Sequence, residues 1–217
     1  AADLKAIPAD ATMAQVVKLD LAATLAAGLA WMEAVQAGSS GQVTQMLDQV
    51  RAVAGIDVVA HLLEPLGDTW TVYAPPQGAA AAVVGLDEPK TFAKTHKALL
   101  GLFRQAADQP GMPPLQVAER QVVDDKSGPV TVFTVSLPGG KLEPAWCIHG
   151  DRLLVAESSA HLEKMMDRAG DAASLADVAA VKPLLGDRVA SLGYQEPIAV
   201  DAPRRFELPT READGED

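Results

Sequence analysis

The chain has 217 residues, of which 48% are hydrophobic and 22% are charged, so it can bury one sizeable core or two small ones. Its net charge of −11 at pH 7 disfavours nucleic acids and anionic lipid surfaces as partners, because an acidic surface repels phosphate groups. The single cysteine, Cys147, excludes an intramolecular disulfide and a metal site built from several cysteines.

The first predicted elements are a strand and a long helix. Residues 12–20 contain a short valine-rich run, which predicts a buried strand. Residues 21–36 are rich in alanine and leucine, and their larger apolar side chains recur three to four positions apart, which predicts a helix. Because Glu33 interrupts this run, we expect a helix of a water-soluble protein and no integral membrane segment.

A second helix is predicted after the breaker sequence AGSSG, with Ser40 as its N-terminal cap and Gly55 at its end. A third, short helix follows, with Asp57 as its cap and Pro65 at its end. The second helix has an amphipathic pattern, and its apolar stripe consists of Val43, Met46, Leu47, Val50 and Val53.

The rest of the chain alternates hairpins with helices. Strand-like runs at 68–76 and 79–87 flank a turn, and a helix with Pro89 in its first turn follows. Two further strands are predicted at 115–123 and 129–137.

The sharpest local signal is a pair of apolar runs joined by Gly150 and Asp151, which predicts a two-residue hairpin. A short helix comes next, capped by one of the serines at 158–159. Ser174 and Asp177 then have the spacing of a capping box at the start of another helix.

These elements predict an α+β fold: a mainly antiparallel sheet built from hairpins and covered by helices on one face. Residues 1–196 form a single domain in this prediction, and residues 197–217 form an extended or flexible acidic tail. A core of this size could take up the large aromatic side chains of the predicted elements, which are Trp31, Trp70, Trp146, Phe92, Phe103 and Phe133.

A weak internal pseudo-repeat relates residues 64–73 to residues 182–194. Both segments run from a short helix through Pro, Leu and Gly-Asp into a strand that ends near a tyrosine. We interpret the shared step as a structural joint, in which a glycine at a flexible or positive-φ position ends the helix and an aspartate stabilises the turn. The alternative is the rim of an active site around the first aspartate. The joint residues are Gly67, Asp68, Trp70, Gly186 and Asp187.

One pattern suggests nucleophilic chemistry. Cys147 and His149 are two apart on a predicted strand and therefore point to the same face, and Asp151 follows at the turn. Catalytic cysteines usually lie at a helix N-terminus that lowers their pKa, whereas Cys147 is in the middle of a strand. We therefore favour a buried structural cysteine and predict no catalytic residue.

Other site chemistries have less support. The four histidines, His61, His96, His149 and His161, lack the spacing of metal ligands, so we predict no metal site and no cofactor. His96 falls on the apolar face of its helix, which is typical of a core histidine. Solvation and turn formation suffice to explain the carboxylates of Glu64, Asp124 and Asp125. The chain has neither a phosphate-binding glycine loop nor a G-x-S-x-G motif.

The string LLEPLGDTWTVYAPPQGAAAAVVGLDEPKTF resembles a domain of unknown function found in exported bacterial proteins, especially from planctomycete-type genomes. The matching positions are an LGD-x-W step at Leu66 to Trp70 and a D-x-x-x-F helix start that reaches Phe92. The later string PAWCIHGDRLLVAESSAHLEKMM is similar to that family's Pro-Ala-Trp hairpin and following helix. The resemblance covers most of residues 8–195, and it implies an extracytoplasmic α+β module without an assigned activity or catalytic residue.

Three functions are compatible with these observations. The first is a non-enzymatic exported module, periplasmic or secreted, that binds a protein partner or forms a subunit of a larger assembly. The second is a carrier of an apolar ligand held between helices and sheet. The third is a hydrolase-type enzyme that uses Cys147 and His149. Because the chain begins at Ala1, we also expect a processed product or part of a longer protein.

Overall fold

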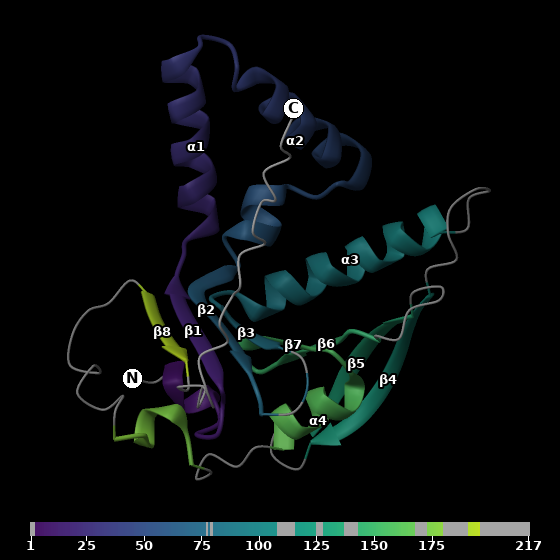
Figure 1. Cartoon of the computed structure of the whole chain (residues 1–217). Coiled ribbons are helices and arrows are strands. Elements are labelled where there is room, and N and C mark those ends of the chain that lie inside the picture. Colours follow the sequence, from purple (N-terminus) through teal and green to yellow (C-terminus); the bar gives the residue numbers. More distant parts are fainter. Residues whose placement is uncertain are drawn as a thin grey trace, which may run out of the picture.

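Eight strands form one antiparallel sheet in the computed structural model of the chain, which describes residues 3–76, 78, 80–107, 116–124, 128–136, 143–167, 173–179 and 191–195 (Figure 1). The strands are β1 Met13–Lys18, β2 Leu66–Ala74, β3 Ala81–Leu86, β4 Gln116–Asp124, β5 Gly128–Ser136, β6 Ala145–His149, β7 Arg152–Ala156 and β8 Ser191–Gln195. They lie in the order β4-β5-β6-β7-β3-β2-β1-β8. The helices are α1 Leu21–Val35, α2 Gly41–Ala54, α3 Pro89–Ala107 and α4 Ser159–Asp167, with helical turns η1 Asp3–Ala6, η2 Val59–Leu63 and η3 Leu175–Asp177. The predicted α+β class is confirmed.

Local signals in the sequence place most of the element ends. The Asp20 carboxylate caps α1 by accepting the Ala23 N–H at 2.8 Å. Asp57 accepts two N–H groups at the start of η2, and the Ser158 hydroxyl caps α4. Gly150 has a φ of 61° at the first position of the β6–β7 turn, a conformation that favours glycine. The caps at Asp57 and Ser158 and this turn agree with the sequence predictions, whereas the cap at Asp20 was not predicted.

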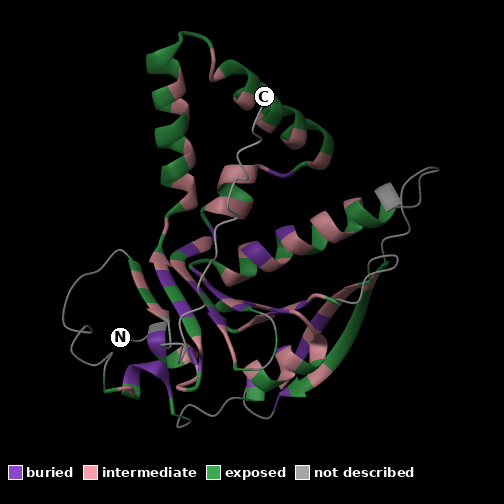
Figure 2. Cartoon of the chain, viewed as in Figure 1, coloured by how far each residue is buried: buried purple, intermediate pink, exposed green. Residues whose placement is uncertain are grey.

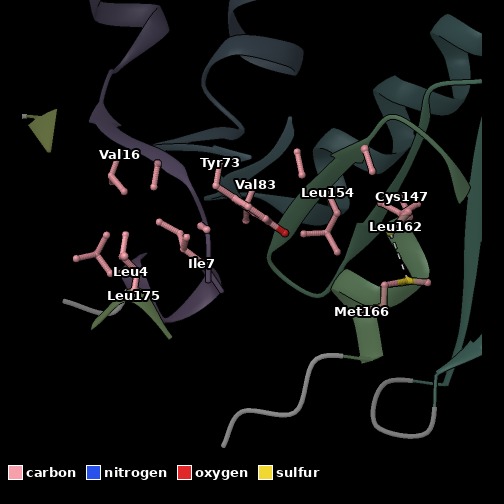
Figure 3. Close-up of a cluster of buried hydrophobic side chains, with 14 of the residues drawn as sticks. Leu4, Ile7, Val16, Tyr73, Val83, Cys147, Leu154, Leu162, Met166 and Leu175 are labelled. Atoms are coloured by element: carbon pink, nitrogen blue, oxygen red, sulfur yellow. Dashed lines mark hydrogen bonds between the residues drawn. The ribbon is translucent and has the colours of Figure 1, made fainter. Parts of the chain in front are cut away.

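One face of the sheet carries the main core, which Figure 3 shows in close-up. Side chains from β1, β2, β3, β5, β6 and β7 pack there against η1, η3 and α4. Leu162 and Met166 of α4 and Leu175 of η3 are buried in this layer. Residues on this face alternate along each strand, as in Ala14 and Val16 of β1, because successive strand side chains point to opposite faces.

The helix α3 covers the opposite face. Its His96 contacts Trp146 of β6, whereas the next residue, Cys147, contacts Met166 of α4. Because neighbouring residues of a strand point to opposite faces, α3 and α4 lie on different sides of the sheet. The sequence led us to expect helices on one face. The difference arises because the central strands are apolar on both faces, as adjacent Val83 and Val84, both buried, show.

The helices α1 and α2 form an arm, residues 21–54, that projects away from the sheet (Figure 1). Within the part of the chain that the structure describes, no residue of either helix is buried, and Figure 2 shows both helices mainly as exposed. The expectation that the core takes up every aromatic side chain was wrong for Trp31, which is 67% exposed, and for Phe103, which is 38% exposed. The predicted cap at Ser40 was also wrong: its hydroxyl donates to Glu33 and makes no bond to the α2 backbone.

The C-terminal region is described only in part. The capping box of Ser174 and Asp177 is present at η3. β8 is an edge strand of the sheet and pairs with β1, which pairs with β2 on its other side. Ala14 of β1 is the partner of Tyr73 of β2 and also of Tyr194 of β8. The pseudo-repeat thus places its two tyrosines at the same level of the sheet. The rest of the helix predicted after Ser174, the joint residues Gly186 and Asp187, and the tail at 197–217 lie outside the described residues.

Candidate functional site

The joint at the start of β2 is built around a bulge. Between the pairs Leu66–Leu86 and Trp70–Val84, β2 has three residues and β3 only one, Gly85. Gly67 lies in this bulge and is buried, and a Cβ atom there would meet the Gly85 backbone at 3.0 Å. Gly67 is not among the glycines with positive φ, so the predicted reason for this glycine was wrong. It is required by the close approach of two strands.

Asp68 and Trp70 connect this bulge to the base of the arm. The Leu19 N–H donates to the Asp68 carbonyl at 2.6 Å, and the Trp70 indole N–H donates to the Leu19 carbonyl at 3.1 Å. Leu19 lies between β1 and α1. The Asp68 carboxylate also pairs with Lys18 at 3.3 Å. The two residues therefore fasten the segment from which α1 starts.

The surface beside the joint has a small cavity of about 280 Å³. Gly67 and Asp68 line it together with Asp87, Asp151 and Arg152, whereas Trp70 does not. The bond from the Thr69 hydroxyl is the main cause that lowers the pKa of the Asp68 carboxyl, and Lys18 adds to it. Asp68 is thus held as an anion and has no feature of a general acid. The contacts of Asp68 and Trp70 with Leu19 are those of a structural joint, and this assignment remains a prediction.

Cys147 cannot act as an accessible nucleophile in this fold. Its side chain is 0% exposed, and its thiol lies 3.6 Å from the Met166 sulfur (Figure 3). Burial raises the pKa of the thiol from 9.0 to about 12, so the thiol stays protonated at neutral pH. These properties are those of the buried structural cysteine that the sequence favoured.

The carboxylate beside His149 is not the expected one. His149 Nε2 lies 3.0 Å from Oδ2 of Asp124, which ends β4 and is 6% exposed. Asp151 instead lies at the exposed hairpin turn, where its carboxylate is 3.7 Å from Arg152. The sequence interpretation of Asp124 as a solvated loop residue was wrong. Finding this pair from the sequence would have required the register of β4, β5 and β6, which no local pattern contains.

The four histidines are separate from one another. His61 Nδ1 accepts the Asp57 N–H, and His161 lies 3.7 Å from Glu157. Among the described residues, no group of three or more histidine, cysteine, aspartate or glutamate side chains is arranged to hold a metal ion.

The helix α3 and the strands β4 to β6 enclose a groove with a volume of about 630 Å³. His96 lies in it and accepts the indole N–H of Trp146 at 2.8 Å, with the ring of Phe133 edge-on at 4.7 Å. Desolvation lowers the pKa of His96, and the carboxylate of Glu119 opposes this effect, so His96 is a neutral acceptor. His96 has a hydrogen-bond partner, as predicted, but it is half-buried at the groove and not in the core.

The lining of this groove is amphipathic. Leu100, Phe133 and Ile148 contribute apolar surface. Lys97 and Arg104 lie at the same groove on the α3 side, and Arg104 forms an ion pair with Glu119 of β4. A groove of this kind has the size and lining of a small-molecule site.

The arm presents the most unusual surface of the described chain. α1 has Thr24 and Glu33 as its only polar side chains, although it is a surface helix. The exposed residues Ala23, Ala27 and Trp31 are four positions apart and therefore share one face of α1. This exposed face has no stripe of polar side chains. A surface helix that is apolar all round is normally covered by other groups. The exposed apolar side chains of the arm also include Val35, Met46 and Val53.

The tip of the arm is fixed by a carboxylate. Glu33 accepts the Gly38 N–H at 2.9 Å and the Ser40 hydroxyl at 2.7 Å. The bond from Ser40 is the main cause that lowers the pKa of the Glu33 carboxyl. The connection between α1 and α2 is therefore ordered by its own polar groups, and the apolar faces of both helices remain accessible.

Comparison of the chain with protein-family models, with curated proteins and with solved structures finds no match. Over the described residues, no helix combines the length and the apolar character needed to span a membrane.

Proposed function

We propose that the chain is a non-enzymatic binding module that associates with protein through its arm. The observation that carries this proposal is the apolar, unburied surface of α1 and α2. Exposed apolar patches of this kind on a folded domain are typical of protein interaction sites. Trp31 is the side chain best suited to anchor a partner, because tryptophan buries a large area at low conformational cost.

The chemistry of the described residues supports a binding role over an enzymatic one. Cys147, the only thiol, is fully buried. His96 is engaged with Trp146, and the carboxylate of Asp68 is held by Lys18 and Thr69. These groups stabilise the fold at their positions, and none of them pairs an accessible nucleophile with a general base.

The test is affinity capture from the native source, followed by a mass measurement of the captured complex by size exclusion. We expect the wild-type chain to elute in a complex and a Trp31→Glu variant to lose it, because a charge at the centre of an apolar interface is costly. Val123 is a matched control: it is 76% exposed on β4, outside the arm, and Val123→Glu adds the same charge. Elution of the wild-type chain as a lone monomer would contradict the proposal.

The groove under α3 supports a second candidate function, the carriage of an apolar ligand. Its volume of about 630 Å³ and the apolar part of its lining, Leu100, Phe133 and Ile148, favour this role. Native mass spectrometry of gently extracted protein would then show a bound small molecule, which a Leu100→Glu variant would lose. Absence of any such molecule from the wild-type protein would count against this function.

An extracytoplasmic location forms part of the first proposal and rests on the resemblance to exported bacterial proteins. Fractionation of cells of the native source tests it. We expect the chain in the periplasmic or secreted fraction, and its recovery with cytoplasmic proteins would contradict the location without affecting the role of the arm.

A further inference from the structure

We propose that the groove between α3 and the strands β4 to β6 binds an amphipathic monocarboxylate, an aliphatic chain of about eight to twelve carbons that ends in one carboxylate. This inference rests on the second proposed function, because it names the class of ligand for the same groove. Three features of the groove carry it: its positive charge, its neutral hydrogen-bond donors and the apolar part of its lining.

The helix α3 is cationic in an acidic chain. It has no acidic residue and a net charge of +4, whereas the whole chain has a net charge of −11. Its basic residues are Lys90, Lys94, Lys97 and Arg104. Because these are three, four and seven positions apart, they share one side of the helix, and Lys97 and Arg104 line the groove. This side of α3 is therefore a place where the acidic chain attracts an anion.

Lys97 is the cation of the groove that is available to a ligand. Arg104 already forms an ion pair with Glu119 of β4. Among the described residues, Lys97 has no ion-pair partner, and its side chain is exposed. These three charged groups of the groove leave a net charge of +1. One carboxylate balances this charge, whereas a dianion would leave a negative charge beside Glu119.

His96 and Thr131 supply neutral donors at the same groove. Because Nε2 of His96 accepts the indole N–H of Trp146, the proton of the neutral ring is on Nδ1. Over the described part of the chain, Nδ1 has no hydrogen-bond partner, and it is open to solvent. Thr131 Oγ1 accepts from the Gln121 amide at 2.8 Å, which leaves its hydroxyl proton to donate. An ionised carboxylate only accepts hydrogen bonds, so it suits these donors.

The strands supply apolar surface for the aliphatic chain of the ligand. Phe133 of β5 pairs with Trp146 of β6, and Ile148 is two positions further along β6, so the three side chains share one face of the sheet. Leu100 lines the groove from α3. The volume of about 630 Å³ is within the range of sites that bury most of a small ligand, and each methylene group buried there favours binding.

Calorimetric titration of the purified full chain with decanoate, below the concentration at which decanoate forms micelles, tests the inference. We expect one decanoate per chain, and Lys97→Gln should weaken binding about fivefold or more, because it removes the charge that pairs with the carboxylate. Lys94→Gln is the matched control: it removes the same charge from an exposed position of α3 that does not line the groove. It should leave the affinity within about twofold, because solvent and salt screen a charge at that distance.

Two further ligands separate this inference from the function on which it rests. Decanol and decyltrimethylammonium have the same aliphatic chain without a negative charge, and they should bind more weakly than decanoate. Leu100→Gln should weaken decanoate and decanol alike, because it removes an apolar contact. Higher salt should weaken the binding of decanoate and leave that of decanol unchanged.

Decanol that binds as tightly as decanoate, or equal effects of Lys97→Gln and Lys94→Gln, would overturn the carboxylate as ligand and leave the carriage of an apolar ligand intact. A wild-type chain that binds neither decanoate nor decanol would contradict both. A chain that binds vesicles of phosphatidylglycerol and not free decanoate would overturn the inference in favour of a lipid surface.

Discussion

At the scale of single residues, titratable groups are used here to hold elements together. The carboxylate of Asp124 meets His149 across strands, the ring of His96 accepts the indole N–H of Trp146, and the carboxylate of Glu33 fixes the tip of the arm. Asp124 is buried and His96 is half-buried, and each has a specific partner, as burial requires, whereas Glu33 accepts its hydrogen bonds at the exposed surface. These titratable side chains therefore form contacts that stabilise the fold.

Cys147 gives the clearest prediction of pH dependence. Because burial raises the pKa of its thiol from 9.0 to about 12, the folded chain keeps a proton that the unfolded chain releases between these values. The free energy of unfolding should therefore fall as the pH rises from about 9 to about 12. Cys147→Ala should lack this component and should cost about 1 kcal/mol at neutral pH. Urea unfolding of both proteins across this pH range measures the difference.

A thiol reagent provides the control for the buried cysteine. At pH 8 the native chain should react only as fast as it unfolds, whereas the chain in concentrated urea should react at once with one equivalent. Rapid modification of the native chain would show that the thiol is accessible, and it would reopen the enzymatic hypothesis built on Cys147 and His149.

Gly67 and Gly85 form a matched pair of glycines for testing the joint. A methyl group at Gly67 would meet backbone atoms of Gly85 at 3.0 Å and the Asp87 carboxylate at 3.1 Å, whereas a methyl group at Gly85 has its nearest contact at 3.8 Å. We expect Gly67→Ala to lower the free energy of unfolding by about 1 to 3 kcal/mol and Gly85→Ala by less than about 1 kcal/mol. Equal effects in denaturant titrations would argue against close approach as the reason for Gly67.

At the scale of elements, the sequence predicted helices and strands well wherever their signals are local. Asp57 and Gly150 act within a few residues of their own position, so this cap and this turn could be foreseen. The cap at Ser40 failed because Glu33, seven residues away, takes its hydroxyl. Local capping preference cannot anticipate a contact that depends on how two helices meet.

The position of α1 shows that the spacing of apolar residues predicts a helix but not whether its apolar face is buried. Its larger apolar residues recur at helical spacing, which predicts a helix and one apolar face but does not say what covers that face. Trp31 was expected in the core and is exposed instead. The lack of a polar stripe opposite the apolar one distinguishes α1 from a helix packed on one side only, but a helix that is apolar all round is normally buried, so the sequence did not indicate that Trp31 is exposed. The pairing of His149 with Asp124 needed strand register and could not be foreseen either.

The N-cap of α1 can be tested in isolation from the core. Asp20→Ala removes the carboxylate that accepts the Ala23 N–H, and it should destabilise α1 by about 1 kcal/mol. Because α1 has no buried residue in the described chain, we expect this loss to appear in the arm rather than in the sheet. Hydrogen exchange should become faster for the amides of α1 and stay unchanged for those of β6 and β7. Faster exchange throughout the sheet would show that the arm and the sheet unfold together.

At the scale of the whole molecule, the chain combines an acidic sheet domain with an almost uncharged arm. The two properties have opposite effects on association, since the charge keeps most surfaces apart and the apolar helices favour contact. The fastening of Leu19 by Asp68 and Trp70 connects them, because it holds the base of the arm against β2. The joint at residues 67–70 therefore holds the residue that precedes α1, and in this way it positions the arm.

The most direct test of the central claim, that the arm is covered by protein in the native assembly, is photo-cross-linking in the native source. A photoreactive residue replaces Trp31, and the same residue placed at the exposed Lys94 of α3 serves as the control. We predict covalent adducts of position 31 with another protein chain, and background adducts from position 94. A yield from position 31 no higher than that from position 94 would contradict the claim.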